Sequence, residues 1–289
     1  TLHSFAAFSG DAMPMNEVFT PGRLKEYEDW LLQRRLSWNT ISTYMRTLQA
    51  VYNRLSPPGT PEHNPRLFDD VYTKVKSQIK RALTEEQMGR LMHADLDVLS
   101  EELQRVQAYF LLMFLFRGMP FIDLAHLRKR DVKDGKIAYR RHKTGKQITL
   151  RIPREALPLL KEFKDKDETS LYLFPILNAA PEGDEALYEC YQKALRNFNK
   201  MLRVLAKRLL PGIKISSYTA RHTWATLAYH IGMPIGIICQ ALGHSSIRVT
   251  ETYLKPFENE KVDKANRKLI STIRKCEGRS IGCFIPYKT

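Results

Sequence analysis

The chain has 289 residues, of which 43% are hydrophobic, so it is long enough for two domains that each bury a core. Its 46 lysines and arginines outnumber 31 aspartates and glutamates, and this net charge of +15 favours a polyanionic partner, either nucleic acid or an anionic membrane surface. The four cysteines form no C-x-x-C pair and show no metal-type spacing with the eight histidines. We therefore expect a reduced, cytoplasmic protein that uses no metal ion or other cofactor.

The longest apolar run extends from Val106 to Phe116 and is about half the roughly 20 residues that cross a bilayer. It predicts a buried helix. The chain opens without a basic-then-apolar signal segment, and its first residue, Thr1, is not a methionine. We expect the sequence to be part of a longer chain with a further segment upstream.

Helical periodicity dominates the first third of the chain. Apolar residues recur at helical spacing over 20–36 and 39–55, with Thr20 and Asn39 as the expected N-caps. A third helix is predicted over 67–79. These helices have enough apolar residues on one face to form a small core of their own.

A domain boundary is expected at residues 79 to 83. Thr84 is followed by Gln87 three residues later, which is the spacing of a capping box and predicts a new helix start. The sequence thus divides into one helical domain over 1–80 and a larger domain over 84–289.

The larger domain combines helices with one short stretch of strand periodicity. The Val106–Phe116 helix is expected to end at Gly118, and Pro120 to begin the next. Residues 135–153 alternate apolar and polar side chains about a turn that contains Gly145, which predicts a hairpin. Helical periodicity then returns over five segments, 184–209, 218–231, 234–242, 246–254 and 258–275. The fold class is mainly α with a small β-hairpin.

Basic residues are concentrated around this hairpin. Between Leu127 and Arg154 the chain has eleven lysines and arginines against two aspartates. Such a density is typical of a surface that follows a phosphate backbone. Lys143 lies at the predicted tip, where it could protonate a leaving oxygen, enter a DNA groove or simply be solvated.

Two further residues stand out near helix ends. Arg221 falls in the first turns of the 218–231 helix, where an anion is favoured and a guanidinium can bind phosphate with two donors, although a surface ion pair is the alternative. His244 follows the helix-ending Gly243 and precedes Tyr253 by nine residues. Taken alone, Tyr253 is either a nucleophile or an ordinary aromatic residue at the edge of a core.

The segments "KTGK", "ARHTWATL" and "ALGHSSIRVTETYL", in this order, make the chain resemble the tyrosine recombinases, or phage integrase family. The segments "RGMP" and "YTARHTW" together resemble a branch of integrases carried by bacterial mobile elements. The resemblance covers nearly the whole chain. It implies an N-terminally truncated, SAM-like core-binding domain over 1–80 and a catalytic domain with a C-terminal helix and tail over 84–289. It also implies a tetramer on paired double-stranded DNA sites in the bacterial cytoplasm, with accessory DNA-bending or directionality factors and no membrane association.

The same resemblance implies a metal-free reaction. Tyr253 would attack a phosphodiester, leaving a 3'-phosphotyrosine and a free 5'-hydroxyl, and a second strand would reverse the step. Arg221 would clamp the phosphate, Lys143 would act as general acid, and His244 would donate to a nonbridging oxygen. These roles match what phosphoryl transfer requires, a nucleophile, an acid and cations at the phosphoryl oxygens.

The chain departs from the family pattern at two positions. Pro120 occupies the place of the family's first catalytic arginine, and we expect Arg117, three residues earlier, to reach the same site, unless it is only a surface residue. Tyr218 replaces the first histidine of the H-x-x-R motif; its hydroxyl can donate to phosphate but is a poor proton acceptor at neutral pH. His222 is expected to fix packing or a hydrogen bond.

Basic residues of both domains are expected to contact DNA, namely Arg140, Arg141, Lys146, Arg128, Lys129 and Arg46. Two alternatives to a recombinase remain open: a DNA-binding relative with impaired catalysis, because of Pro120 and Tyr218, and a type IB topoisomerase, which shares the chemistry. A basic helical protein that binds nucleic acid by charge alone is the generic alternative.

Overall fold

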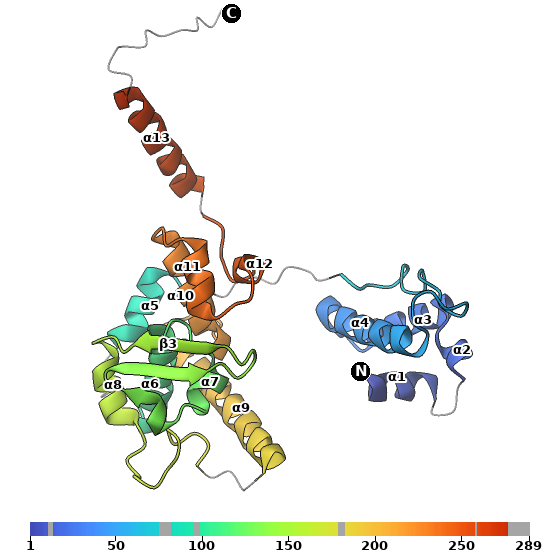
Figure 1. The fold of residues 1–289 in the computed structure, drawn as a ribbon, viewed down its shortest axis with the longest axis horizontal. Coiled ribbons are helices and arrows are strands. Elements are labelled where there is room, and N and C mark those ends of the chain that lie inside the picture. Colours follow the sequence, from blue (N-terminus) through green and yellow to red (C-terminus); the bar gives the residue numbers. More distant parts are fainter. Residues whose placement is uncertain (11–13, 75–81, 95–98, 179–182, 258, 277–289) are drawn as a thin grey trace, which may run out of the picture. The chain divides into compact units, whose positions relative to one another are not determined.

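The chain forms two compact units, Thr1–Ile79 and Lys80–Thr289, shown in the computed structural model of Figure 1. The structure describes residues 1–10, 14–74, 82–94, 99–178, 183–257 and 259–276. Each unit has its own buried apolar cluster.

The first unit is helical throughout its regular part. Its helices are α1 (Leu2–Ser9), α2 (Met15–Val18), α3 (Pro21–Gln33) and α4 (Trp38–Leu55). Their apolar faces share one core, made of Phe5, Val18, Leu24, Tyr27, Leu31, Ile41, Met45, Leu48, Tyr52, Leu67, Phe68 and Val71. Helices α3 and α4 confirm the predicted segments, whereas α1 and α2 were not predicted from the sequence.

One of the two predicted N-caps is confirmed. The Thr20 side chain accepts a hydrogen bond of 3.2 Å from Arg23 N at the start of α3. At α4 the prediction was wrong by two residues, because Ser37 rather than Asn39 is the cap and accepts from Thr40 N at 3.2 Å.

The predicted third helix over 67–79 is absent where the structure describes it, over 67–74, and its remainder lies outside the described residues. Turns replace it. The backbone N–H of Tyr72 donates to the buried Glu28 carboxylate at 2.6 Å, so a side chain takes the donor that a helix would have paired internally. Leu67, Phe68 and Val71 still reach the core from these turns.

The second unit is built around one buried helix, α6 (Glu101–Leu115), which contacts α5 (Glu85–Met92) and three later helices. Nine of its fifteen residues are buried, which confirms the buried helix predicted from the apolar run. Among the described residues, no helix is both long and apolar enough to span a membrane. Thr84 and Gln87 exchange two hydrogen bonds, of 3.2 and 3.0 Å, confirming the capping box of α5.

The remaining elements follow in chain order. They are α7 (Phe121–Ala125), the 3-10 turn η1 (Lys129–Asp131), β1 (Val132–Lys133), β2 (Lys136–Arg140), β3 (Gln147–Arg151), α8 (Ala156–Phe163), α9 (Asp184–Leu209), α10 (Ser217–His230), α11 (Ile235–Leu242), α12 (Ile247–Glu251) and α13 (Asn259–Cys276). The five late helices confirm the predicted segments, although α12 ends three residues early. Helix α8 was not predicted.

The sheet is antiparallel in the order β1-β2-β3. The predicted hairpin is confirmed: β2 pairs with β3 so that Ile137 faces Leu150 and Tyr139 faces Ile148. These four side chains are buried in the main core and alternate with exposed residues along each strand. The two-residue strand β1 was missed because it is too short to show alternation.

Helix α10 differs from its predicted packing. The helical spacing of Trp224, Leu227, Ala228 and Ile231 predicts that these four residues form its buried stripe, yet Ile231 is 73% exposed. Small and polar residues are buried instead, namely Ala220, Arg221, Thr223, Ala225, Thr226 and Ala228. Helix α10 contacts α6, α9 and α11, so it is enclosed on several sides and needs small residues for close approach (Figure 1).

The end of α11 depends on the glycine that was predicted to stop it. Gly243 has a left-handed φ of 65°, and a Cβ there would lie 2.8 Å from Cδ1 of Ile148 on β3. The corner before His244 therefore packs directly on the sheet. Both the backbone angle and the contact favour glycine.

Gly243→Ala is expected to lower the free energy of unfolding by about 2 to 4 kcal/mol, from left-handed strain plus overpacking. Gly145→Ala is the matched control, because Gly145 also has a φ of 65° but no atom lies within 4 Å of its added Cβ. Its loss should be limited to about 1 to 2 kcal/mol. Equilibrium denaturation of both variants measures the difference, and equal losses would show that Ile148 yields without cost.

Candidate active site

Four of the predicted catalytic residues come together where α10, α11 and α12 meet, side by side at one end of the second unit (Figure 1). Tyr253 lies just after α12 and is 9% exposed. Its ring is centred 4.9 Å from the His244 ring, and the Arg221 guanidinium lies 5.6 Å from its centroid. The Tyr218 hydroxyl is 2.9 Å from the Tyr253 hydroxyl.

Arg221 is the buried cation of this cluster, with 2% of its surface exposed. Its Nη1 donates to the Gly118 carbonyl at 2.8 Å and its Nη2 to the Leu242 carbonyl at 2.5 Å. Its Nε has no hydrogen-bond partner among the described residues. Burial, followed by the nearby charge of Arg141, lowers the pKa of Arg221.

His244 is held from both sides of its ring. Nε2 lies 3.0 Å from Nη2 of Arg221, and Nδ1 lies 2.9 Å from the Thr250 hydroxyl. Because a guanidinium only donates, Nε2 is the acceptor and the proton of neutral His244 sits on Nδ1. Burial and the charge of Arg221 lower the pKa of His244 to about 3, so the ring is neutral at pH 7.

Tyr253 is fixed through its backbone as well as its hydroxyl. The Tyr253 carbonyl accepts from the Thr226 hydroxyl at 3.2 Å and lies 3.3 Å from Nδ1 of His222. His222 thus makes the hydrogen bond expected of it. Burial, and then the partner phenol, raises the pKa of Tyr218 to about 12, so Tyr218 is a neutral phenol at pH 7.

Among the described residues, the two remaining predicted catalytic residues make no hydrogen bond or ring contact with this cluster. Lys143 is exposed in the turn between β2 and β3, and its charge is one of those that lower the pKa of His244. Arg117 has a left-handed φ of 60° and is half-buried. It lines a cavity of about 330 Å³ with residues of β3 and α11, and none of Tyr253, Arg221 or His244 lines that cavity.

Arg141 belongs to the cluster, although its sequence position suggested only a DNA contact. Its side chain is 4% exposed, and its Nη1 donates to the Gly243 carbonyl at 3.0 Å. Its Nε lies 4.0 Å from Oδ2 of Asp123, a buried carboxylate. Ile137 and Tyr139 are the buried alternate residues of β2, and the same period of two places Arg141 on their face. This alternation could have identified Arg141 from the sequence as an inward-facing residue.

The other predicted DNA contacts differ in exposure. Arg140 and Lys146 are exposed beside the turn that contains Lys143, and Arg46 is exposed on α4 of the first unit. Arg128 and Lys129 are half-buried, and the Lys129 ammonium donates to the Asp167 carbonyl. Their contacts with DNA stay predictions.

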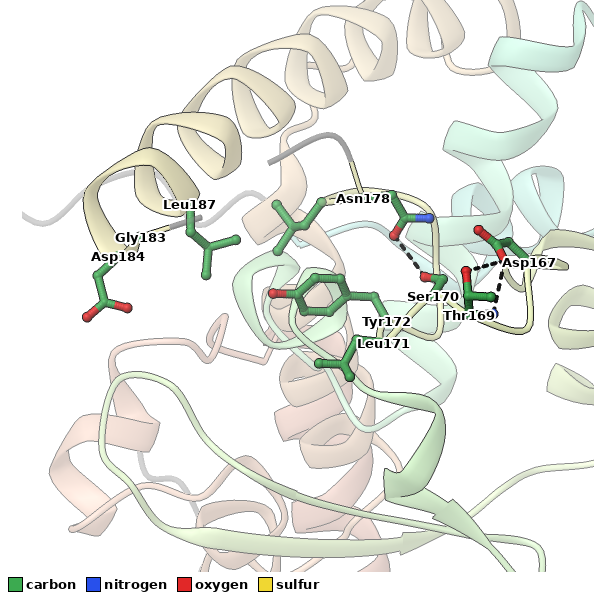
Figure 2. Close-up of a pocket in the computed structure, with 10 residues that line it drawn as sticks. Asp167, Thr169, Ser170, Leu171, Tyr172, Asn178, Gly183, Asp184 and Leu187 are labelled. Carbon is green, nitrogen blue, oxygen red and sulfur yellow. Dashed lines mark hydrogen bonds between the residues drawn. The ribbon is translucent and has the colours of Figure 1, made fainter. Parts of the chain in front are cut away.

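A separate pocket of about 460 Å³ lies between the loop after α8 and the start of α9, as Figure 2 shows. Its polar side chains are largely paired with one another: Thr169 bonds to Asp167, and Ser170 to Asn178. None of the predicted catalytic residues lines it. Within the part of the chain that the structure describes, no three histidine, cysteine or acidic side chains are grouped to hold a metal ion.

Comparison with known proteins relates the second unit to one family. Residues 81–260 match the model of the phage integrase family. A tyrosine recombinase of Thermosipho africanus is 23% identical over 230 residues, which are 79% of this chain and 75% of that protein. The tyrosine recombinase XerA of Pyrococcus furiosus is 27% identical over 246 residues, 82% of this chain and 79% of its own.

Two solved structures share the fold. The Tn1549 transposon integrase in complex with a circular intermediate DNA has a TM-score of 0.63 and 17% identity, covering 92% of this chain and 91% of its own. A lambda integrase dimer bound to a COC' core site has a TM-score of 0.62 and 15% identity, covering 87% and 84%. The predicted fold class is confirmed.

The low pKa of His244 makes stability depend on pH. The unfolded histidine has a pKa of about 6.5 and the folded one about 3, so the unfolded chain binds the extra proton between these values. Stability is therefore full above about pH 6.5 and falls as the pH drops toward 3. Between about pH 7.5 and 5.5, His244 alone should account for a loss of about 1 to 1.5 kcal/mol.

His244→Gln is the matched variant, since its side chain does not titrate. Denaturant unfolding of both proteins at the two pH values gives the difference in slope, and other titrating groups cancel. The same pH dependence in both proteins would show that the His244 pKa is not depressed.

Proposed function

The chain belongs to the phage integrase family and is a tyrosine-type site-specific recombinase, and we propose that it cleaves and rejoins DNA strands through a 3'-phosphotyrosine formed on Tyr253. The observation that carries this is the position of the Tyr253 side chain, next to the buried Arg221 and His244 and hydrogen-bonded to Tyr218. A tyrosine at the edge of a core has no need of a buried guanidinium beside its ring.

The proposed step exchanges one phosphate ester for another. The Tyr253 oxygen forms a bond to phosphorus while the bond from phosphorus to the 5' oxygen breaks. The phenolic proton of Tyr253 passes to solvent water and Lys143 gives one proton to the departing oxygen, which leaves a free 5'-hydroxyl. Because one P–O bond replaces another, no external energy is required, and a 5'-hydroxyl of a second strand reverses the step on a new partner.

Arg221 and His244 would stabilise the charge on the phosphoryl oxygens. Arg221 is already oriented by two carbonyls, so its remaining donors need little rearrangement when phosphate arrives, which is the property that makes such groups effective. In the DNA-free protein, Nε2 of His244 accepts a hydrogen bond from Arg221. To donate to a nonbridging oxygen it must gain a proton, and a bound phosphate anion would favour that by raising its pKa.

Tyr218 would orient the nucleophile. Its pKa of about 12 keeps it a neutral phenol, so it is a poor acceptor for the Tyr253 proton but a good hydrogen-bond partner at 2.9 Å. The same hydroxyl can donate to phosphate once Tyr253 has become an ester. This explains how a site without the family's first motif histidine keeps the tyrosine aligned.

DNA would be held mainly through its backbone. The net charge of +15 and the exposed side chains of Arg140, Lys146 and Arg46 suit phosphate contacts, to which Arg128, Lys129 and Arg141 would add. Two related structures are DNA complexes, the Tn1549 integrase and the lambda integrase, which supports a duplex DNA partner.

Assembly would use the last helix. On α13 the apolar residues Val262, Leu269 and Ile273 recur at helical spacing, and all three are exposed. An exposed apolar stripe on a helix of this length fits a groove of another subunit. We propose that α13 joins subunits into a tetramer on paired sites, with accessory DNA-bending or directionality factors acting on that assembly.

The nucleophile is tested with a suicide substrate that traps the covalent intermediate. Wild-type protein should form a DNA adduct, and Tyr253→Phe should form none, because only the hydroxyl oxygen is removed. Tyr188→Phe, at an exposed tyrosine of α9, is the matched control and should retain the adduct. An adduct with Tyr253→Phe would reject this assignment. No adduct with wild type would favour a catalytically impaired DNA-binding relative, and relaxation of supercoils without a specific site would favour a topoisomerase.

The assembly role of α13 is tested by Leu269→Ser combined with Ile273→Ser. Synapsis and recombination should fall at least tenfold, while binding to a single site and formation of the Tyr253 adduct should stay within about twofold. The control pair, Glu260→Ser with Lys264→Ser, lies on the opposite face of the helix and leaves the net charge unchanged. Equal synapsis by both double variants would rule out the apolar stripe as a contact.

A further inference from the structure

Pro120 leaves the position of the family's first arginine without a cation, and Arg117, the arginine of the turn after α6, lines a cavity that none of Tyr253, Arg221 or His244 lines. Pro120 is buried and caps α7 with an extended backbone, so it contributes no donor there. Phosphoryl transfer places charge on more than one nonbridging oxygen, and Arg221 is the only guanidinium among the predicted catalytic residues that lie beside Tyr253 in the described part of the chain. A second cation is needed near Arg221.

We propose that Arg141 is this second cation and that its guanidinium contacts a nonbridging oxygen of the phosphate attacked by Tyr253. The inference rests on the proposed function, since it assumes that the phosphate binds beside Tyr253. It assigns a catalytic role to a residue of the hairpin rather than to Arg117.

Arg141 and Arg221 converge on the same corner of the backbone. Arg141 donates to the carbonyl of Gly243, and Arg221 donates to the carbonyl of Leu242, the preceding residue. Adjacent carbonyls lie only a few ångström apart along a chain with about 3.8 Å between Cα atoms. The two guanidiniums are therefore neighbours, next to His244.

Two glycines make room for the two arginines. A Cβ on Gly243 would lie 3.4 Å from Cδ of Arg141, and a Cβ on Gly118 would lie 3.2 Å from Cγ of Arg221. Both glycines also have left-handed φ angles, 65° and 69°. The turns that contain Gly118 and Gly243 thus leave space for the side chains of Arg221 and Arg141.

This corner is short of negative charge. Arg141 and Arg221 are both almost fully buried, and the charge of Arg141 lowers the pKa of Arg221 and contributes to lowering the pKa of His244. The carboxylate facing Arg141, Asp123, is 4.0 Å from its Nε, with no hydrogen bond between them, and burial raises the pKa of Asp123. Buried cations need a paired anion, and a phosphodiester would supply one.

Unused donors point to the same conclusion. The Nε of Arg141 and the Nε of Arg221 are both buried without a hydrogen-bond partner among the described residues. Unpaired buried donors are rare in folded proteins and cost free energy. A phosphate oxygen between the two side chains would give such donors a partner with a small shift of either guanidinium.

Arg117 is placed less well for this task. It lines its cavity with Ile237, Gln240 and Ala241 of α11, whereas Arg141 and Arg221 bind the carbonyls at the end of that helix. Asp123, three residues after Pro120, accepts the His142 N–H at 2.9 Å and so ties the α7 turn to the end of β2. The helix that begins after Pro120 thus helps to hold the strand end that supplies Arg141.

A purely structural role, in which Arg141 only joins the hairpin to the Gly243 corner, is the competing explanation. A substrate with a neutral scissile phosphate distinguishes the catalytic role of Arg141 from the structural one. In a methylphosphonate, a methyl group replaces one charged nonbridging oxygen, so a cation that neutralises this charge becomes dispensable. A residue that only supports the fold is needed equally with both substrates.

The experiment measures the rate of Tyr253 adduct formation on suicide substrates with a phosphodiester or a methylphosphonate at the cleavage position. Arg141→Ala should lose about 10²- to 10³-fold on the phosphodiester. On the methylphosphonate it should stay within about tenfold of wild type. Arg141→Lys, which keeps the charge but not the two-donor geometry, should lose less on the phosphodiester and be near wild type on the methylphosphonate.

Arg151→Ala is the charge-matched control, since Arg151 is exposed on β3 of the same sheet, and it should resemble wild type on both substrates. Melting temperatures identify a variant that does not fold, and in that case Arg141→Lys decides. Equal losses of Arg141→Ala on both substrates would overturn the proposal. It would also be overturned if Arg117→Ala, rather than Arg141→Ala, lost activity on the phosphodiester and regained it on the methylphosphonate. Failure of the proposed function is distinct, because wild-type protein would then form no adduct.

Discussion

The hydrogen bonding of one buried guanidinium to backbone carbonyls is the interaction on which the second unit depends. Arg221 lies inside α10 with 2% of its surface exposed, and carbonyls of Gly118 and Leu242 hold it. Both carbonyls belong to the last turns of helices or the residues just beyond, where backbone acceptors lack helical partners and the helix dipole is negative. A cation buried without such acceptors would cost several kcal/mol. Helices α6, α10 and α11 must therefore assemble together.

The rest of the site follows from this arrangement. Because Arg221 donates to Nε2 of His244, the ring is neutral and its other nitrogen is free to bond Thr250 on α12. That bond fixes α12, and α12 is followed directly by Tyr253, whose carbonyl is held in turn by Thr226 of α10. A chain of hydrogen bonds thus runs from the buried cation to the backbone of the tyrosine.

The departures from the family pattern lie at the rim of this network rather than within it. Pro120 caps α7, and Tyr218 meets the Tyr253 hydroxyl from a partly exposed position. Neither changes the contacts of Arg221 with the two carbonyls. In the proposed reaction, Arg141 and the Tyr218 hydroxyl take the places of the missing arginine and histidine.

Local patterns in the sequence determined most of the secondary structure and the identity of the central residues. Helical periodicity, the Thr84 capping box, the helix-ending Gly243 and the strand alternation around Gly145 each depend on neighbours within a few residues, so they are visible without a fold. The motif around Arg221, His244 and Tyr253 was visible for the same reason. Where a distant side chain takes over a backbone donor, as Glu28 does at Tyr72, the local prediction failed.

Strand alternation indicates that Arg141 faces inward and Arg140 outward, but only the tertiary structure decided what the inward side chain contacts. The two arginines are adjacent in a run of basic residues, yet Arg140 is exposed and Arg141 is 4% exposed beneath Gly243. Their difference arises because successive residues of a strand point to opposite faces and only one face of this sheet meets the end of α11. The contact joins residues about a hundred positions apart, 141 and 243, and no local pattern specifies such a contact.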